Sequence, residues 1–334
     1  MTAEVRGADV AGQGVGARQG AVLVTGAAGF VGRHTVEAFH RAGFRVTAVD
    51  LRPAPVPLMR AARWERADYA DAALLAQVAA GRFGTVVHLA TAGDEAAGPA
   101  EAALTGPARL ADACAAGGAR LLYASSYAVY GVQHRQEPLP EDAEDDRTRC
   151  SGPLGSYARS LLALDRHMRA RHATGLDWAG LRCTHVFGPD EQDKGLAASF
   201  LSRLVRAAAS RGRVRLYDDT LTAARDHLPV GTVTETLVLL ARRPEPVPPD
   251  VYNLGSGHPV SFAELLQWCA RARREAGGGA LEVDLVANPA AATYRHYTCA
   301  GTTRLDKALP GRPTVTRQDV ESRTAALFAH FSPL

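Results

Sequence analysis

A short apolar run followed by three spaced glycines most limits what this chain can fold into. Residues 21–50 read AVLVTGAAGFVGRHTVEAFHRAGFRVTAVD. The first residues are mostly aliphatic, Gly26, Gly29 and Gly32 follow, and apolar residues then recur at helical spacing before a second apolar run. This order predicts a strand, a glycine turn, a helix and a second strand, which together make a βαβ unit of a parallel sheet.

Later segments continue the alternation of strands and helices. GTVVHLAT (84–91) and ARLLYASSYAVYG (119–131) are predicted to be buried parallel strands, with Ala- and Leu-rich helices around them. A helix is expected over 156–172 and a further strand within 176–190. The predicted fold class is α/β, a doubly wound parallel sheet (Rossmann) with a smaller α+β C-terminal substrate domain.

The weakening of this alternation after the strand within 176–190 predicts where the domains divide. We expect residues 1–19, which are rich in Gly and Ala, to be a flexible tail. The dinucleotide-binding domain is predicted to span 20–185, and the family resemblance given below implies that 225–253 returns to it. The substrate domain is then formed by 186–224 and 254–330.

Composition and charge exclude several classes of protein. The chain has 334 residues, of which 46% are hydrophobic and 22% charged, and a formal net charge of +3, so it offers no extended basic surface for nucleic acid or membrane. No apolar run reaches the roughly 20 residues that cross a bilayer. Its five cysteines are scattered and form no metal-binding spacing, which favours reduced thiols, a cytoplasmic location and no metal site.

The glycine turn predicts a dinucleotide site. Gly26 permits the tight turn, and the missing side chains let a pyrophosphate approach the N-terminus of the helix. Asp50 ends the second strand, where a carboxylate can bind the adenosine ribose hydroxyls, and it favours NAD because it repels a 2′-phosphate. Arg33 and Arg52 leave NADP open. Asp68 could meet the adenine amino group or could cap a helix.

A series of motifs resembles one enzyme family. TGAAGFVG resembles the family's glycine motif, VVHLAT the strand beneath the nicotinamide, and YASSYAVYG the serine-bearing strand. SYARSL stands where the family has Tyr-x-x-x-Lys, and GLRCTHVFGP, ARDHLPVGTVTETL and VYNLGSGHPVSFAELL resemble its later segments. Over residues 20–330 the chain therefore resembles the extended short-chain dehydrogenase/reductases, also called the NAD-dependent epimerase/dehydratase family.

The resemblance implies a set of cofactor contacts. These contacts include the glycine turn, Asp50 and the segments that follow the later strands of the sheet. The implied NAD-binding residues are Gly26, Gly29, Phe30, Val31, Gly32, Asp50, Leu51, Asp68, Tyr69, Leu89, Ala90, Thr91 and Thr184.

The resemblance also implies the reacting groups, with two departures. Ser126 matches the family's active-site Ser/Thr, and Tyr157 matches the tyrosine that exchanges a proton with the substrate. Leu161 stands where a lysine would bind the nicotinamide ribose and lower the tyrosine pKa, and Ala103 replaces the asparagine of the same set. No lysine lies nearby, because Lys194 and Lys307 are the only two in the chain.

The remaining assignments concern the substrate. Arg225 and Arg295 match segments that line the family's substrate cleft and are expected to bind an anionic group such as a diphosphate; the alternative is a surface arginine beside an acid. Tyr127 is assigned to the substrate with them. His185 replaces an asparagine and is a candidate acid/base, or else a packed core histidine. His227 is expected to be structural.

We therefore expect an NAD-dependent enzyme acting on a sugar-like, nucleotide-activated substrate by ketone/alcohol redox or epimerisation. One alternative is a non-redox cyclase, lyase or isomerase that uses Tyr157, Ser126 and His185, with a structural or absent cofactor. The other is a cofactor-binding regulatory protein without turnover. The helices over 100–116 and 156–172 correspond to those that often pair in this family, so a homodimer is expected.

Overall fold

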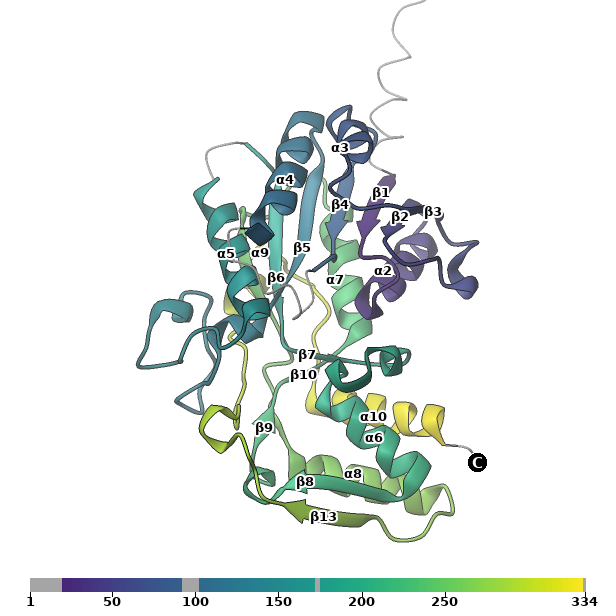
Figure 1. Cartoon of the computed structure of the whole chain (residues 1–334), viewed down its shortest axis with the longest axis vertical. Coiled ribbons are helices and arrows are strands. Elements are labelled where there is room, and N and C mark those ends of the chain that lie inside the picture. Colours follow the sequence, from purple (N-terminus) through teal and green to yellow (C-terminus); the bar gives the residue numbers. More distant parts are fainter. Residues whose placement is uncertain (1–19, 92–101, 172–174, 333–334) are drawn as a thin grey trace, which may run out of the picture. The chain divides into compact units, whose positions relative to one another are not determined.

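The predicted βαβ unit opens the structure (Figure 1). The computed structural model describes residues 20–91, 102–171 and 175–332, so the predicted tail over 1–19 lies outside the described residues. Strand β1 (Ala21–Thr25) is followed by helix α2 (Phe30–Arg41) and strand β2 (Arg45–Asp50). All five residues of β1 are buried, as expected for a central strand with helices on both faces.

Seven strands form the main sheet, in the order β11-β6-β5-β4-β1-β2-β3. Strand β1 pairs in parallel with β2 and β4, β2 with β3, and β4 with β5. The chain moves outward from β1 to β3 and then crosses back to β4, which is the strand order of a doubly wound sheet. The other strands are β3 (Arg63–Arg66), β4 (Thr85–His88), β5 (Arg120–Ser126), β6 (Trp178–Cys183) and β11 (Asp250–Leu254).

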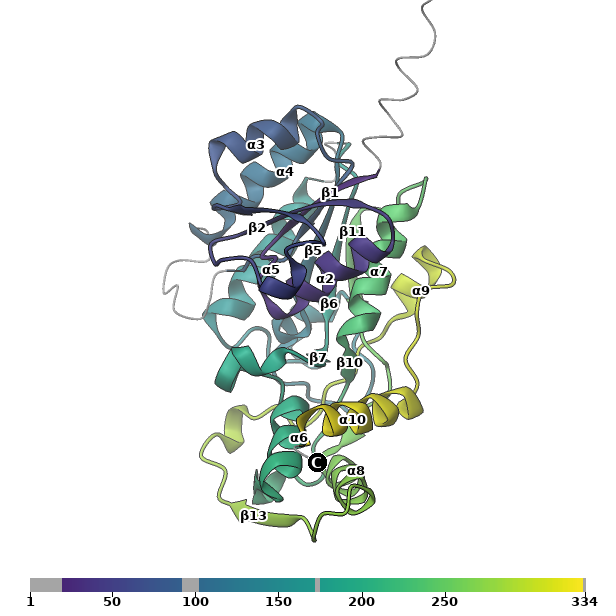
Figure 2. The same cartoon turned by 90° about the vertical axis from the view of Figure 1, so that its right-hand side faces the viewer.

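The reversal at β3 places helices on both faces of the sheet, because right-handed crossovers in opposite directions emerge on opposite sides. Helix α3 (Ala72–Ala79) packs beside α4 (Thr105–Gly117) on one face, and α2 covers the other (Figure 2). The predicted fold class is confirmed.

Several element boundaries differ from the expected ones. The segment expected to be one strand over 119–131 is β5 followed by a 3-10 turn over Tyr127–Tyr130. The strand ends because the Ser126 hydroxyl accepts a hydrogen bond from the Ala128 backbone N–H (3.1 Å) and caps that turn. The helix expected over 156–172 is α5 (Ser156–Ala170). The strand expected within 176–190 divides into β6 and β7 (His185–Phe187).

The chain divides into two compact units, each described here by itself. The first unit contains the described residues of Met1–Tyr123, Arg166–Ala179 and Leu237–Asp250. The second unit contains Ala124–Asp165, Gly180–Thr236 and the described residues of Val251–Leu334. The domain boundaries expected from the sequence stay a prediction.

The second unit contains three small sheets and a helical layer. Its sheets pair β7 with β10, β9 with β12, and β8 with β13. Helix α6 packs against α8 and α10, and Figure 1 shows β8 and β13 beside them. The remaining elements are α6 (Phe200–Arg211), β8 (Arg213–Tyr217), β9 (Ala224–Arg225), β10 (His227–Pro229), α7 (Val230–Arg242, shared with the first unit), β12 (Val260–Ser261), α8 (Phe262–Glu275), β13 (Glu282–Val286), α9 (Thr303–Ala308) and α10 (Arg317–Phe331).

Side-chain caps fix where two of these helices begin. Ser261 and Glu264 form a capping box at α8, and Thr316 and Asp319 form another at α10. None of the helices in the described part of the chain is both long and apolar enough to cross a membrane.

Candidate functional site

The glycine turn of the first unit is shaped by close backbone approach. Gly26 has a φ of +66°, and a Cβ there would lie 2.5 Å from the Ala90 backbone nitrogen. A Cβ on Gly32 would lie 2.1 Å from the Gly26 carbonyl oxygen. A side chain at either position would displace backbone, so these two glycines are required by the turn itself.

Gly29 leaves the N-terminus of α2 open. It is the N-cap residue, and its backbone N–H donates to the Gly26 carbonyl at 3.0 Å. Within the described residues, no side chain caps this end of α2 and no acidic residue lies in its first turn. Phe30 and Val31 begin the helix. The exposed backbone N–H groups and the helix dipole therefore suit a phosphate group.

Asp50 is held in place at the end of β2. Its Oδ2 accepts a hydrogen bond from the Ala28 N–H (2.9 Å), and its Oδ1 accepts one from the Arg52 N–H (2.9 Å). The Arg52 side chain adds contacts of 3.2 and 3.3 Å. Burial by itself would raise the Asp50 pKa, but the hydrogen bonds from Arg52 and Ala28 outweigh it, and the pKa lies below its usual value. Asp50 is thus an ionised acceptor beside the glycine turn.

The Asp68 carboxylate is exposed and accepts from the Ala70 N–H at 2.9 Å, whereas Asp71 is the residue that caps α3. Leu51 also lies on the surface, 65% exposed. The alternative interpretation, in which Asp68 is the N-cap residue of a helix, is therefore wrong.

Tyr69 is packed over the end of β4. Its ring lies 4.6 Å from that of His88, measured between centroids, and a Cβ on Gly106 would lie 2.5 Å from its hydroxyl oxygen. Leu89, Ala90 and Thr91 follow His88 directly. The predicted cofactor residues of the first unit thus follow β1, β2, β3 and β4 at the carboxyl end of the sheet, where ligands of doubly wound folds bind.

His88 is a polar residue of this region that sequence reasoning missed. It is buried, and its Nδ1 lies 2.8 Å from the Thr25 hydroxyl, which links β4 to β1. Burial lowers the His88 pKa to about 4, so the ring is neutral at pH 7. In the sequence, a histidine at the end of an apolar strand was the feature that could have predicted this buried polar contact.

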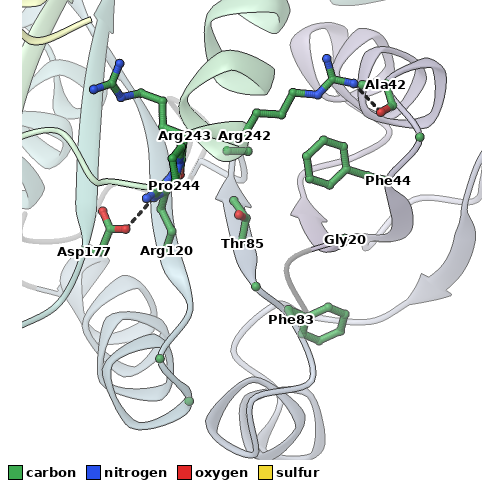
Figure 3. A pocket seen from close by; sticks show the side chains of 15 residues that line it. Gly20, Ala42, Phe44, Phe83, Thr85, Arg120, Asp177, Arg242, Arg243 and Pro244 are labelled. Atoms are coloured by element: carbon green, nitrogen blue, oxygen red, sulfur yellow. Dashed lines mark hydrogen bonds and ion pairs between the residues drawn. The ribbon is translucent and has the colours of Figure 1, made fainter. Parts of the chain in front are cut away.

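A pocket lies at the other end of the same strands (Figure 3). It has a volume of about 660 Å³ and is lined by residues at the amino-terminal ends of β1, β4 and β5, among them Gly20, Thr85 and Arg120. Arg120 is held by Asp177 at 2.6 Å, and Arg242 donates to the Ala42 carbonyl at 2.6 Å. These arginines serve structural bonds at the ends of helices, so this pocket is not the cofactor site.

The two matched reacting groups lie in the second unit. Ser126 ends β5, and its hydroxyl caps the following turn. Tyr157 lies in the first turn of α5 and packs against an apolar cluster. Leu161, one turn further on, is 5% exposed and belongs to that cluster. The position where the family resemblance predicts a lysine therefore holds a packed apolar side chain.

A buried ionic network ties together the elements that carry Ser126 and Tyr157. Asp165 of α5 accepts a hydrogen bond from the Ser125 hydroxyl (3.0 Å) and one from Arg182 of β6 (2.7 Å). Arg182 is fully buried and also bonds Glu144 at 3.0 and 3.2 Å. Because Asp165 and Ser125 each share an element with a candidate reacting group, this network sets the relation of α5 to β5.

The same network explains the acidic segment over residues 141–146. Five acids in six positions are typical of a solvated loop, but Glu141 and Glu144 are each only 2% exposed. Arg182 binds Glu144, and Arg304 lies 3.5 Å from Glu141. The arginine inside an otherwise apolar strand was the signal that buried carboxylates exist elsewhere, because a buried cation requires partners.

Arg225 lies in an aromatic cage. The centre of its guanidinium is 5.1 Å from the ring centroid of Tyr294, 5.2 Å from that of Phe262 and 5.9 Å from that of Phe200. Its Nε–H donates to the Arg295 carbonyl oxygen at 3.3 Å. The cage orients the guanidinium and leaves its remaining N–H groups for another acceptor.

Arg225 and Arg295 form a half-buried pair of cations. Burial, with the nearby charges of Arg295 and Arg203, lowers the Arg225 pKa to about 10, and burial also lowers the Arg295 pKa. Among the described residues, neither guanidinium has a carboxylate within ion-pair distance. A partly desolvated cation pair without an anion is the arrangement expected of a site for an anionic ligand.

The other predicted residues of this unit are Thr184, His185 and Tyr127. Thr184 follows β6, with its hydroxyl 3.4 Å from Asp226. Tyr127 is 3% exposed, and its hydroxyl lies 2.8 Å from both the Gln133 side-chain oxygen and the Cys299 carbonyl oxygen. Burial is the main cause that raises the Tyr127 pKa. Its assignment to the substrate stays a prediction, and its observed contacts are internal.

His185 begins β7, and burial, with the charges of Arg225, His227 and Arg295, lowers its pKa well below the usual value. The ring is thus neutral at pH 7. A neutral imidazole next to two arginines can donate a hydrogen bond but gains a proton only with difficulty.

Comparison with known proteins identifies the class. The family model described as "NAD dependent epimerase/dehydratase family" matches residues 22–255, and the chain belongs to that family. It is therefore of the extended short-chain dehydrogenase/reductase type, and the expectations of an enzyme and of NAD as the cofactor are confirmed.

Individual relatives share most of the chain. The ADP-L-glycero-D-manno-heptose-6-epimerase of Thiobacillus denitrificans is 28% identical over 314 residues, covering 86% of this chain and 92% of its own. MoeE5 in complex with UDP-glucose and NAD is 28% identical with a TM-score of 0.71, covering 92% of this chain and 98% of its own. The Helicobacter pylori ADP-L-glycero-D-manno-heptose-6-epimerase has a TM-score of 0.77 at 21% identity, covers 95% of this chain and 98% of its own, and shows the shared fold.

Proposed function

We propose that this enzyme acts on a nucleotide-activated sugar by ketone/alcohol redox, either as a net reaction or as a transient step of epimerisation. The observation that carries the substrate class is the half-buried pair Arg225 and Arg295, which lacks a carboxylate among the described residues. A diphosphate supplies the missing negative charge, and guanidinium groups bind its oxygens in pairs. MoeE5, at 28% identity, was solved with UDP-glucose and with UDP-glucuronic acid, which supports this class.

Tyr157 and Ser126 are proposed to act on the reacting oxygen of the sugar. Reduction of a ketone requires a hydride at carbon and a proton at oxygen. NAD supplies the hydride chemistry when bound. The Tyr157 hydroxyl gives the proton in reduction and recovers it in oxidation, and the Ser126 hydroxyl holds the oxygen in place. With Leu161 at the lysine position, no cation from that position favours the ionised tyrosine, so proton donation is the easier direction.

The cofactor contacts are also proposals. The fit rests on the space that a Cβ on Gly26 or Gly32 would fill, on the uncapped N-terminus at Gly29 and on the ionised Asp50. The pyrophosphate is assigned to Gly29 and the first turn of α2, and the adenosine ribose to Asp50. The other proposed contacts are Gly26, Phe30, Val31, Gly32, Leu51, Asp68, Tyr69, Leu89, Ala90, Thr91 and Thr184.

The buried Leu161 favours one second candidate, a non-redox cyclase, lyase or isomerase on the same fold. Absorbance at the nicotinamide wavelength separates the two functions. The redox proposal expects a change during turnover for a net reaction, or a transient change in a single turnover of an epimerase. Product formation without any such change would favour the second candidate.

The substrate proposal is tested by calorimetry with UDP-glucose on Arg225→Ala. We expect affinity to fall about 10- to 100-fold, because one charge-assisted contact to phosphate is lost. Arg213→Ala is the matched control, since Arg213 is an exposed arginine of the same unit that pairs with Asp284 at 2.7 Å. Equal affinities in Arg225→Ala and the unmodified protein would exclude Arg225 from the site.

We also propose a cytoplasmic homodimer. The five cysteines are all buried and unpaired, which fits a reducing compartment. The dimer is assigned to the helices over 105–117 and 156–170, and sedimentation of the purified chain tests it: a monomer at micromolar concentration would contradict the assignment.

A further inference from the structure

Two histidines that face each other in the second unit have an unusual set of ring nitrogens. Strands β7 and β10 pair in parallel, with His185 opposite His227. The two ring centroids are 6.0 Å apart, with an angle of 50° between the ring planes. Two imidazoles joined by a direct hydrogen bond have centroids about 5 Å apart, so a side-chain shift of about 1 Å brings these two into contact.

Three of the four ring nitrogens are buried without a partner. His227 is 0% exposed, and neither its Nδ1 nor its Nε2 has a hydrogen-bond partner among the described residues. The Nε2 of His185 is likewise buried and unpartnered, whereas its Nδ1 is not in this group. Buried donors without partners are rare because each loses its bond to water without replacement. A phenylalanine would fill the same space as His227 without that cost.

Both rings are neutral, which limits how they can pair. Burial, with the charge of Arg225, lowers the His227 pKa to about 3, and the His185 pKa lies well below its usual value. Among the described residues, the charged groups that act on the pair are Arg225 and Arg295. Each ring therefore carries one N–H and one lone pair.

One direction of pairing leaves no buried N–H without an acceptor. If His227 donates to Nε2 of His185, the hydrogen of His185 lies on Nδ1, which is not among the buried unpartnered atoms, and the only buried atom left unmatched is a lone pair on His227. In the opposite direction, the N–H of His227 is left buried without an acceptor. Orphaned N–H groups are rarer in proteins than unsatisfied acceptors, so the first direction is favoured.

We propose that His227 is a positioning residue whose ring N–H donates to Nε2 of His185, so that His185 presents Nδ1–H to the substrate as a hydrogen-bond donor and not as a base. The inference rests on the proposed function, because Arg225 and Arg295, which are proposed to bind the substrate, both act electrostatically on the His185 ring. A neutral imidazole in this state can polarise a carbonyl or hold a hydroxyl of the sugar. The base for alcohol oxidation must then be a group other than His185.

The tautomer is tested directly by NMR on the full-length protein with ¹⁵N-labelled histidine, at pH 7 and without ligand. We expect the His185 signals to show a protonated Nδ1 and an unprotonated Nε2, and His227 to show a ring N–H that exchanges slowly with water. His185→Gln and His227→Phe assign the signals. A proton on Nε2 of His185, or an imidazolium, would overturn the proposal. This readout needs no substrate, so it stands even if the proposed function fails.

The functional consequence is tested with two variants of His227. His227→Phe keeps a planar aromatic ring, slightly larger than imidazole, and removes both unpartnered nitrogens, so we expect a melting temperature close to that of the unmodified protein. Its kcat should fall about 10- to 100-fold, as on losing the partner that orients a histidine. His227→Gln retains an N–H that can reach Nε2 of His185 and should recover part of this loss.

The control is Phe187→Leu. The Phe187 ring contacts His227 edge-on at 6.3 Å, so the variant disturbs the same packing without altering a nitrogen. It should lower the melting temperature and leave kcat unchanged. If His227→Phe has the kcat and KM of the unmodified enzyme, His227 is only a packing residue and the proposal is wrong.

Discussion

The cofactor end of the first unit and the reacting groups of the second unit depart from their family by different amounts. At the glycine turn each required feature is present, because Gly26 and Gly32 leave no room for a Cβ and Asp50 is fixed by Ala28 and Arg52. In the second unit, Leu161 and His185 stand where the family resemblance predicts a lysine and an asparagine.

The difference has a physical origin. The glycine turn binds through backbone N–H groups, so its function depends on chain geometry, and few substitutions are compatible with that geometry. The reacting end acts through individual side chains, which can change while the backbone that carries them stays the same. The hypothesis to test is therefore that NAD binding is retained while the proton-transfer chemistry is altered. Substitutions in the buried network that holds the reacting groups of the second unit should have the largest effects.

The buried network of the second unit should give the largest effect. Arg182→Leu leaves Asp165 and Glu144 buried without their partner, and we expect the free energy of unfolding to fall by about 3–5 kcal/mol. Urea denaturation measures it. The exposed Arg213→Leu should cost less than about 1 kcal/mol. Replacing Arg182, Asp165 and Glu144 together by apolar residues should recover much of the loss; equal losses in Arg182→Leu and Arg213→Leu would show that the network is unimportant.

Tyr157→Phe tests whether the altered site still uses its tyrosine. Loss of the proton donor should lower kcat about 10²- to 10⁴-fold while NAD binding, measured by calorimetry, stays unchanged. The neighbouring Ser160→Ala is a control, because the Ser160 hydroxyl only donates to the Tyr157 backbone carbonyl at 2.9 Å. Full activity in Tyr157→Phe would show that another group donates the proton. The site would then differ from the family pattern at Tyr157 as well as at Leu161.

At the cofactor end, Gly29→Val should abolish NAD binding and spare the fold. A Cβ on Gly29 would lie 3.1 Å from the Gly26 carbonyl, which is tight but tolerable, while the rest of the side chain would cover the N-terminus of α2. We expect affinity for NAD to fall at least about 100-fold. Gly43→Ala is the control: its φ is +85°, but no atom lies within 4 Å of the added Cβ. Undiminished binding in Gly29→Val would place the pyrophosphate elsewhere.

What the sequence predicts follows the same division. The βαβ unit and glycine turn are local patterns, so their place in the sheet could be predicted from residues 21–50 alone. The contact of Arg182 with Glu144 joins residues far apart in sequence, and a loop with five acids looks solvated until the buried cation is known. The apolar pattern of the strand continues past Ser126, so the pattern alone does not show that the strand ends there. The strand ends because the Ser126 hydroxyl caps the following turn.

Buried histidines predict how stability depends on pH. The His88 pKa is lowered to about 4 in the folded chain, against about 6.5 unfolded, so the unfolded chain binds the proton first. Its contribution to stability is full above pH 6.5 and falls as the pH drops from 6.5 towards 4, by about 2 kcal/mol at pH 5. The His227 pKa, about 3, gives the second unit the same sign. Denaturation at pH 7 and pH 5 should show a smaller difference in His88→Leu and in His227→Phe than in the unmodified protein; equal differences would contradict the burial argument.

The smallest effect concerns the position where the two regions differ most, Leu161. Leu161→Lys restores a cation one helical turn after Tyr157, and a positive charge on the same helix face favours the ionised phenol. Alcohol oxidation needs the ionised tyrosine, so its rate rises with pH. We expect the pH at which this rate is half-maximal to fall by about one unit in Leu161→Lys, because the added charge stabilises the ionised phenol by about 1.4 kcal/mol. The lysine also enters an apolar cluster, so stability should fall by about 1–3 kcal/mol, whereas Leu161→Met should keep both stability and profile. If the pH–rate profiles of Leu161→Lys and Leu161→Met coincide, the added charge does not change the pKa of Tyr157. The reaction would then not depend on an ionised Tyr157, and a lysine at this position would have no role in it.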